Sequence, residues 1–160
     1  MSNMEIVGLG FYYEDLPLGR SFQTIGRTVT EADITNFINA TGMTEVLFMN
    51  MDFVAEESDI KGRVAPGALA YTFAEGLLVQ VTMQHTAFAF LHMELTIEAP
   101  VFAGDTLHVE CEVIEARLSK SRPGRGLVRT RHKVVKGDGT GALVYTPLRM
   151  IKCRDETLRG

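Results

Sequence analysis

The 160-residue chain lacks tryptophan and contains only two cysteines. Cys111 and Cys153 are too few for a disulfide-dense scaffold, and both lie in strand-like segments, so we predict buried free thiols. No basic segment followed by an apolar stretch opens the chain, which predicts a cytoplasmic protein. No apolar run approaches the ~20 residues of a membrane span. For this length, one domain over residues 1–160 is the simplest organisation.

A basic excess is also absent, because the net charge is −4, but the charges are unevenly distributed. Residues 1–116 carry 17 acidic and 4 basic side chains, whereas residues 117–136 carry 8 basic ones and no acid. That stretch predicts either a phosphate-binding patch or a solvated strand face that balances acidic neighbours. Nucleic acid is a poor fit, because the rest of the chain is acidic and no stacking aromatics interleave the basic residues. None of the four histidines has the spacing of a metal site, so no metal is expected.

The most informative segment is residues 62–81, GRVAPGALAYTFAEGLLVQV. Pro66-Gly67 marks the entry to a helix that is apolar on nearly every side, with Glu75 as its only charge. A helix that is apolar all round must be enclosed by the rest of the fold. Glu75 then needs a partner, which favours a structural ion pair, across a dimer or within the chain, over a catalytic role.

Two further helices are predicted before this segment. Thr30 to Asp33 resembles a capping box, Ile34 and Ile38 share one face at helical spacing, and Gly42 suits the helix end. Residues 51–58 are compatible with a short helix.

Long strands follow the apolar helix. Alternation predicts strands over residues 87–101, 106–118, 127–135 and 142–153, with a hairpin turn at residues 136–139. We therefore expect an α+β fold in which one central helix is wrapped by a curled antiparallel sheet. Such a sheet leaves an edge strand unpaired, which predicts dimers.

Two motifs carry a family resemblance: GRVAPGALAYTFAEGLL, residues 62–78, and EAPVFAGDTLHVECEV, residues 98–113. They resemble the MaoC-like family of hot-dog acyl-CoA hydratases and dehydratases, and the resemblance runs from about residue 15 to residue 152. It implies a hot-dog fold and the addition of water to a 2-enoyl-CoA, or the reverse reaction from a 3-hydroxyacyl-CoA. Coenzyme A is then part of the substrate, and no separate cofactor is expected.

The resemblance also implies a catalytic Asp and His in a loop of the form D-F-N-P-L-H. Residues 43–48 match that loop, with Met43 in the Asp slot and Phe48 in the His slot. Neither side chain transfers protons. The histidine that often precedes the helix glycine is replaced by Pro66.

The binding residues implied by the resemblance are retained. The amide of Gly67 matches the donor to the thioester oxygen, since helix N-termini stabilise negative charge. Thr72 matches a hydroxyl residue near the reacting region. Arg122 and Arg125, in SRPGRGLV, match a loop that we expect to meet the phosphates of coenzyme A.

The altered loop offers a replacement acid–base group. Glu45 is either a lone general base, if an apolar pocket raises its pKa, or a surface glutamate. Asn50 and Asp52 either orient water or cap the following helix. Phe48 and the neighbouring methionines either fill the core or make the entrance of an acyl tunnel apolar, where Phe48, Asn50 and Pro66 would contact substrate.

Three functions remain open. The first is a hydratase or dehydratase with a rearranged acid–base group led by Glu45. The second is a non-catalytic subunit that shapes the acyl tunnel of a partner bearing the Asp/His pair, in a heterodimer instead of a homodimer. The third is an acyl-CoA thioesterase or binding module, for which Glu45 or Asp52 is the candidate carboxylate.

Overall fold

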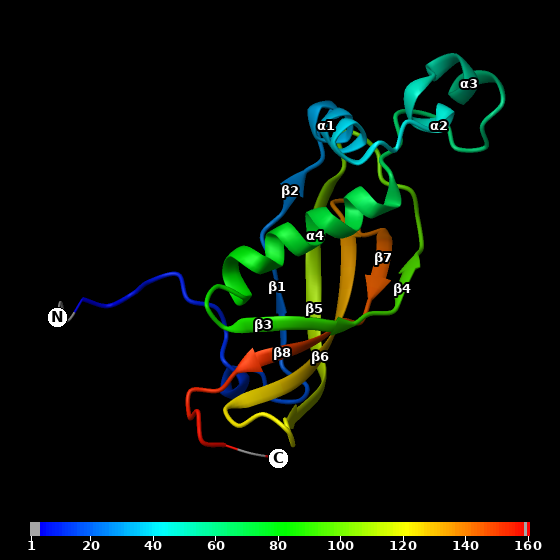
Figure 1. The fold of residues 1–160 in the computed structure, drawn as a ribbon. Helices are drawn as coiled ribbons and strands as arrows, with labels where there is room; N and C mark the ends of the chain where they lie inside the picture. The colour runs from blue at the N-terminus through cyan, green and yellow to red at the C-terminus, as the bar shows by residue number, and fades with distance from the viewer. Residues whose placement is uncertain (1–3, 159) are drawn as a thin grey trace.

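A computed structural model describes residues 4–158 and residue 160. One long helix, α4 (Gly67–Thr82), lies against a curled antiparallel sheet (Figure 1). The sheet order is β1 (Ser21–Gln23), β5 (Thr106–Leu118), β6 (Arg125–Lys136), β7 (Gly141–Tyr145) and β4 (Leu95–Ile97). In addition, β2 (Arg27–Thr28) pairs with β5, and β8 (Leu148–Lys152) pairs with both β6 and β3 (Ala87–His92). The predicted α+β architecture of a central helix and a curled sheet is confirmed.

Strands β5 and β6 form the centre of the sheet. Leu107, Val109, Cys111 and Val113 are buried on the helix side of β5, whereas Glu110 faces away, as the alternation predicts. Burial of one face also fixes the register, because a slip by one residue would exchange the faces.

Two expected long strands are each broken in two. Residues 87–101 form β3 and β4, and residues 142–153 form β7 and β8. The breaks lie side by side, since the Thr146 amide donates to the Glu94 carbonyl at 2.9 Å. Pro147 has no amide hydrogen for the ladder, so the second strand ends there and restarts. The prediction of two continuous strands was wrong, because apolar alternation runs through the bend without marking it.

The N-terminal helices bear out the local signals. Helix α1 (Glu31–Thr41) has the predicted capping box, in which the Asp33 amide donates to Thr30 Oγ1 at 3.1 Å and the Thr30 amide donates to Asp33 Oδ2 at 2.8 Å. It ends at Gly42, whose φ of 74° is left-handed. Two short helices follow, α2 (Val46–Met49) and α3 (Met51–Glu56), and a 3-10 turn, η1 (Tyr13–Asp15), precedes β1.

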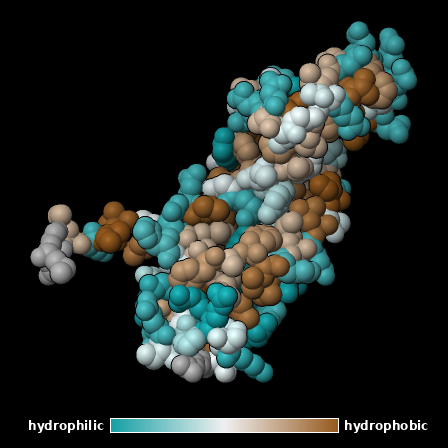
Figure 2. All heavy atoms as spheres, in the orientation of Figure 1, coloured by the Kyte–Doolittle hydropathy of each residue, from teal (hydrophilic) through white to brown (hydrophobic). Residues whose placement is uncertain are grey.

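Helix α4 is covered on one side only. Leu69, Ala70, Ala74 and Leu78 are buried against the sheet, but Val81 is 55% exposed. The prediction that the chain encloses the helix on every side was therefore wrong for a single copy. Figure 2 shows hydrophobic side chains gathered over β4, where the sheet also ends. An uncovered flank of helix and sheet remains on the molecule.

The single charge of α4 is paired within the chain. Glu75 accepts hydrogen bonds from the Tyr145 hydroxyl, at 2.7 Å, and from the buried guanidinium of Arg149. This confirms the structural ion pair and places it inside one copy. Among the described residues, no helix has the length and apolar character needed to cross a membrane.

Candidate functional site

The start of α4 opens into an apolar pocket of about 300 Å³. The pocket wall comes from four parts of the fold: Leu47, Phe48 and Ile60 before the helix, Val64, Ala65, Gly67 and Ala70 at its start, residues 97–101 from the end of β4 onward, and Ala142 and Leu143 of β7. A mostly apolar hollow with a few polar groups is the usual form of a small-molecule site.

Gly67 supplies a backbone donor to this pocket. It is the first residue of a 16-residue helix, so its amide has no acceptor within the helix. The amides of Leu69 and Ala70 donate to the Pro66 carbonyl in this first turn. The Gly67 amide, in contrast, takes part in no hydrogen bond of the described residues. The helix dipole adds partial positive charge at this end. The amide is therefore free to bind an oxygen that carries negative charge.

Position 67 is in close contact with the edge strand. A Cβ atom there would lie 2.5 Å from Cδ1 of Ile97, which belongs to β4. The glycine thus allows the edge strand to approach the helix start, and Ile97 and Gly67 form one wall of the pocket.

Phe48, in the family's histidine slot, is buried and lines the pocket. Met43, in the aspartate slot, is half-buried and packs against the main core. The pocket therefore contains the apolar ring of Phe48 where the resemblance predicts the imidazole of a histidine that transfers protons.

Arg63 holds this segment in place and was not singled out from the sequence. Its Nε donates to Glu31 Oε1 of α1 at 2.7 Å, and its Nη1 donates to the carbonyl of Phe48. The sequence does contain a signal for it, because Lys61 and Arg63 are the only Lys or Arg residues between residues 28 and 116. Arg63 fixes the wall of the pocket without entering it.

Glu45 lies outside the pocket lining. It is exposed at the start of α2 and makes no capping hydrogen bond. Asn50 is also exposed, and its Oδ1 caps α3 by accepting from the amides of Asp52, at 3.0 Å, and Phe53, at 3.1 Å. Pro66 is buried directly before the helix and orients its first turn. Of the polar side chains predicted for this loop, none lines the described pocket.

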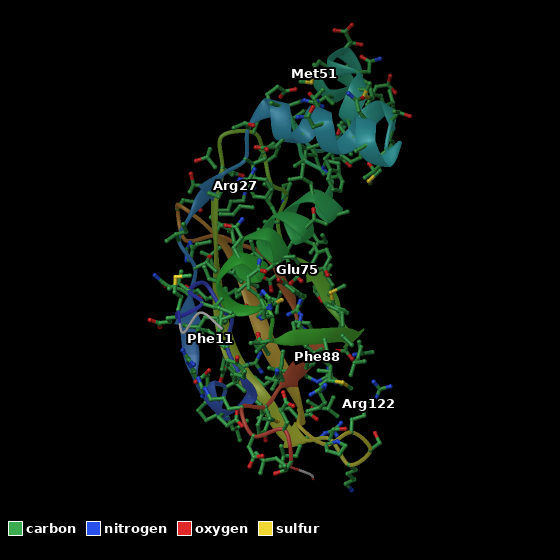
Figure 3. The ribbon with its side chains drawn as sticks, turned by 60° about the vertical axis from the view of Figure 1, so that its left-hand side comes forward. Phe11, Arg27, Met51, Glu75, Phe88 and Arg122 are labelled. Carbon is green, nitrogen blue, oxygen red and sulfur yellow. The ribbon has the colours of Figure 1, made fainter. Side chains whose placement is uncertain are left out.

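Thr72 and the two arginines lie away from the Gly67 pocket in a single copy. The Thr72 hydroxyl donates to the carbonyls of Ala68 and Leu69, and the residue lines a separate hollow beside Arg27 and Phe73. Arg122 lies in the β5–β6 turn, at the opposite end of the molecule from Met51 of α3 (Figure 3). The Arg125 guanidinium stacks 3.9 Å above the Phe88 ring.

The basic stretch divides into two parts. On the strands, Arg117 and Arg129 pair with Glu115, Arg131 pairs with Glu112, and Lys136 pairs with Asp105. In the turn, Lys120 and Arg122 have no acidic partner within the described part of the chain. Most cations of the strand portion are thus balanced by acidic neighbours, whereas Lys133 on β6 and the cations of the turn have no ion pair among the described residues.

The buried titratable groups lie outside the pocket. Burial lowers the pKa of His132 to about 3, and its Nε2 shares a 2.7 Å hydrogen bond with Thr130 Oγ1. Burial raises the pKa of the Cys111 thiol to about 12, and both cysteines are free, as expected. No cluster of three or more His, Cys, Asp or Glu residues suited to a metal ion occurs in the described ranges.

Known proteins match both the sequence and the fold. The family model for the MaoC like domain matches residues 15–136. Protein MaoC of Klebsiella aerogenes is 34% identical over 99 residues, which are 61% of this chain and 29% of that protein, so the chain spans less than a third of this relative's length. The R-hydratase of Pseudomonas aeruginosa has a TM-score of 0.70 at 25% identity, over 93% of this chain and 89% of that one.

A Mycobacterium tuberculosis protein described as a double hot-dog fold has a TM-score of 0.83 at 24% identity. The match covers 98% of this chain and 48% of that chain, so one copy of the present chain corresponds to one half of the double fold. The chain thus has a hot-dog fold, and it belongs to the MaoC-like domain family.

Proposed function

We propose that this chain binds a 2-enoyl-CoA or 3-hydroxyacyl-CoA thioester in the Gly67 pocket and serves a hydratase or dehydratase reaction. One observation carries the proposal: Gly67 lines an apolar pocket, and its amide is unused at the start of a 16-residue helix. The family match and the likeness to an R-hydratase support the same reaction class.

In this proposal the thioester oxygen accepts a hydrogen bond from the Gly67 amide. When water adds to the alkene, its oxygen bonds to C3, a proton reaches C2, and negative charge gathers meanwhile on the thioester oxygen. Removing one such donor typically costs about 3–4 kcal/mol of transition-state stabilisation. The apolar wall formed by Phe48, Ala70 and Leu143 would hold the acyl chain. Coenzyme A enters as part of the substrate, without a separate cofactor.

Water addition also needs a proton-transfer group. Glu45 is the candidate within this chain, and it would act by turning from the exposed start of α2 towards the pocket. Its predicted role and that of Thr72 stay proposals. Glu98 is the one ionisable residue of the described lining. Its carboxylate packs beside Gly141, since a Cβ atom on Gly141 would lie only 2.7 Å from Oε2 of Glu98.

A second candidate function is a non-catalytic hot-dog subunit that shapes the acyl tunnel while a partner chain supplies the Asp/His pair. The specific observation in its favour is that Met43 and Phe48 occupy the family's proton-transfer slots, with Phe48 buried in the apolar core and Met43 half-buried against it. In that case the pocket binds the thioester, and the partner performs the chemistry.

A hydration assay on purified protein separates these functions. Loss of enoyl-thioester absorbance is followed for wild type, Glu45→Gln and the exposed control Glu57→Gln, and thiol release is recorded in parallel. The enzyme proposal expects hydration that falls at least about 100-fold in Glu45→Gln only. Equal rates in all three proteins would remove Glu45 from the mechanism. Binding without turnover favours the subunit function, and thiol release indicates a thioesterase.

A further inference from the structure

The imidazole of His132 on β6 has a buried nitrogen without a partner. Only 2% of the residue is exposed. Its Nε2 shares a 2.7 Å hydrogen bond with Thr130 Oγ1, whereas Nδ1 is buried and has no hydrogen-bond partner among the described residues. Nearly all buried polar atoms of folded proteins are paired, either with the protein or with ordered water, because an unpaired atom retains the cost of its desolvation. A bound molecule outside the chain is therefore indicated at Nδ1.

A small cavity adjoins this imidazole. Its volume is about 30 Å³, and its polar wall consists of His132, Thr130, Thr82 and Arg149. Every other residue of the described wall is apolar, including Phe11 of the N-terminal segment (Figure 3). One water molecule takes about 30 Å³ in the liquid, whereas sites for organic ligands are about ten times larger. The cavity thus has the size for water and not for a substrate.

Two polar groups of this wall have hydrogen-bonding capacity left for a water molecule. The Arg149 guanidinium carries several N–H donors, and its bond to Glu75 is the only hydrogen bond that it makes with the described residues. Thr82 Oγ1 donates to the Leu78 carbonyl at 2.8 Å, so its lone pairs stay available to accept. A buried water typically makes about three hydrogen bonds. Arg149 as donor, with Thr82 Oγ1 and His132 Nδ1 as acceptors, supplies that number.

We propose that this cavity binds one ordered water molecule, which accepts a hydrogen bond from the Arg149 guanidinium and donates to His132 Nδ1 and Thr82 Oγ1. The water connects α4, β6 and β8 at a single point. Its site shares no described lining residue with the Gly67 pocket. The proposal is therefore independent of the proposed thioester function.

The bound water also determines the tautomer of His132. Because Nδ1 accepts from the water, the ring hydrogen lies on Nε2 and is donated to Thr130 Oγ1. The positive charge of Arg149 favours this arrangement, since it orients the water with its oxygen towards the cation and its hydrogens towards the ring. Burial, followed by the charge of Arg149, lowers the pKa of His132 to about 3, so the ring is neutral at neutral pH. A neutral ring with one fixed tautomer is the measurable consequence.

Crystallography and NMR of the wild-type protein test the site. In a crystal structure at about 1.2 Å resolution, we expect a water within ~2.7–3.2 Å of His132 Nδ1, Thr82 Oγ1 and a nitrogen of Arg149. Long-range proton–nitrogen correlation spectra of the ring at neutral pH should show a hydrogen on Nε2 and none on Nδ1. A dry cavity, or a hydrogen on Nδ1, would overturn the proposal.

A pair of threonine variants tests the acceptor role of Thr82. Thr82→Val replaces the hydroxyl by a methyl group of similar size, so the cavity keeps its shape and loses one partner of the water. Thr86→Val is the matched control, because Thr86 is also buried and also donates to a carbonyl four residues earlier, but does not line the cavity. We expect the water peak in the electron density to be lost in Thr82→Val and kept in Thr86→Val. Equal water density in the two variants would contradict the proposed site, and the wild-type measurements decide the matter if a variant does not fold.

Discussion

The side chain of Ile97 packs directly on the backbone of Gly67, with its Cδ1 atom 2.5 Å from where a Cβ of residue 67 would lie. This contact joins the edge strand β4 to the start of α4 and forms one wall of the apolar pocket. A side chain at position 67 would therefore require Ile97 to move.

The first prediction concerns this contact. Gly67→Ala should push Ile97 aside and disturb the donor, which should weaken binding of an acyl-CoA analogue by about tenfold, or ~1.4 kcal/mol. The double variant Gly67→Ala/Ile97→Ala should recover most of that affinity, because the obstructing methyl groups are gone. Isothermal titration calorimetry measures both changes. Unchanged affinity in Gly67→Ala would place the thioester elsewhere.

The second prediction concerns the missing proton-transfer pair. Met43→Asp/Phe48→His restores a carboxylate and an imidazole at the matched slots, and the hydration rate of a 2-enoyl-CoA should rise by about 10²–10⁴-fold. Met43→Asn/Phe48→Gln is the matched control, with polar side chains that do not transfer protons. Equal rates in the two variants, with acyl-CoA binding intact in both, would show that the slots are not placed for catalysis.

The third prediction concerns Glu75, whose carboxylate accepts hydrogen bonds from Tyr145 and the buried Arg149. Glu75→Ala leaves a buried guanidinium without its anion, so the free energy of unfolding should fall by about 3–5 kcal/mol. Tyr145→Phe removes one neutral donor and should cost about 1 kcal/mol. Urea denaturation measures both, with the exposed Glu57→Ala as a control. A loss below 1 kcal/mol in Glu75→Ala would mean that the pair does not stabilise the core.

The fourth prediction concerns pH. Burial lowers the pKa of His132 to about 3, below its ordinary 6.5, so the unfolded chain takes up a proton between these values and the folded chain does not. The contribution of His132 to the free energy of unfolding is therefore fully present above about pH 6.5, and it is lost as the pH decreases towards 3. At pH 5 the loss from this group is about 2 kcal/mol relative to pH 7. In His132→Leu that part of the pH dependence should disappear. An unchanged acid slope would assign it to other groups.

Local signals predicted much of the fold. Thr30, Asp33 and Gly42 mark the ends of α1 through hydrogen bonds and backbone angles that depend on neighbouring residues only. The entry to α4 at Pro66-Gly67 and the alternation of β5 are read in the same way. The break after Tyr145 has a local signal in Pro147, which the alternation obscured, whereas the break after His92 has no such signal and lies beside it through pairing between distant segments.

The candidate site was predicted only in part. Gly67 and Phe48 line the same pocket, and their binding roles stay predictions. Arg63 was missed because its partners, Glu31 and the Phe48 carbonyl, are brought to it by the tertiary fold. Thr72 and Arg122 lie away from that pocket in one copy, since one faces a different hollow and the other lies at the far end of a hairpin. Spacing along a helix or loop does not determine which side of the fold a residue reaches.

The central claim is that the Gly67 amide binds the oxygen of an acyl thioester. A crystal structure with a non-hydrolysable 2-enoyl-CoA analogue tests it most directly. The account predicts the thioester oxygen within ~2.6–3.2 Å of the Gly67 nitrogen, with the acyl chain along Phe48 and Leu143. An analogue bound in the hollow beside Thr72, or with its oxygen beyond hydrogen-bond reach of Gly67, would contradict it.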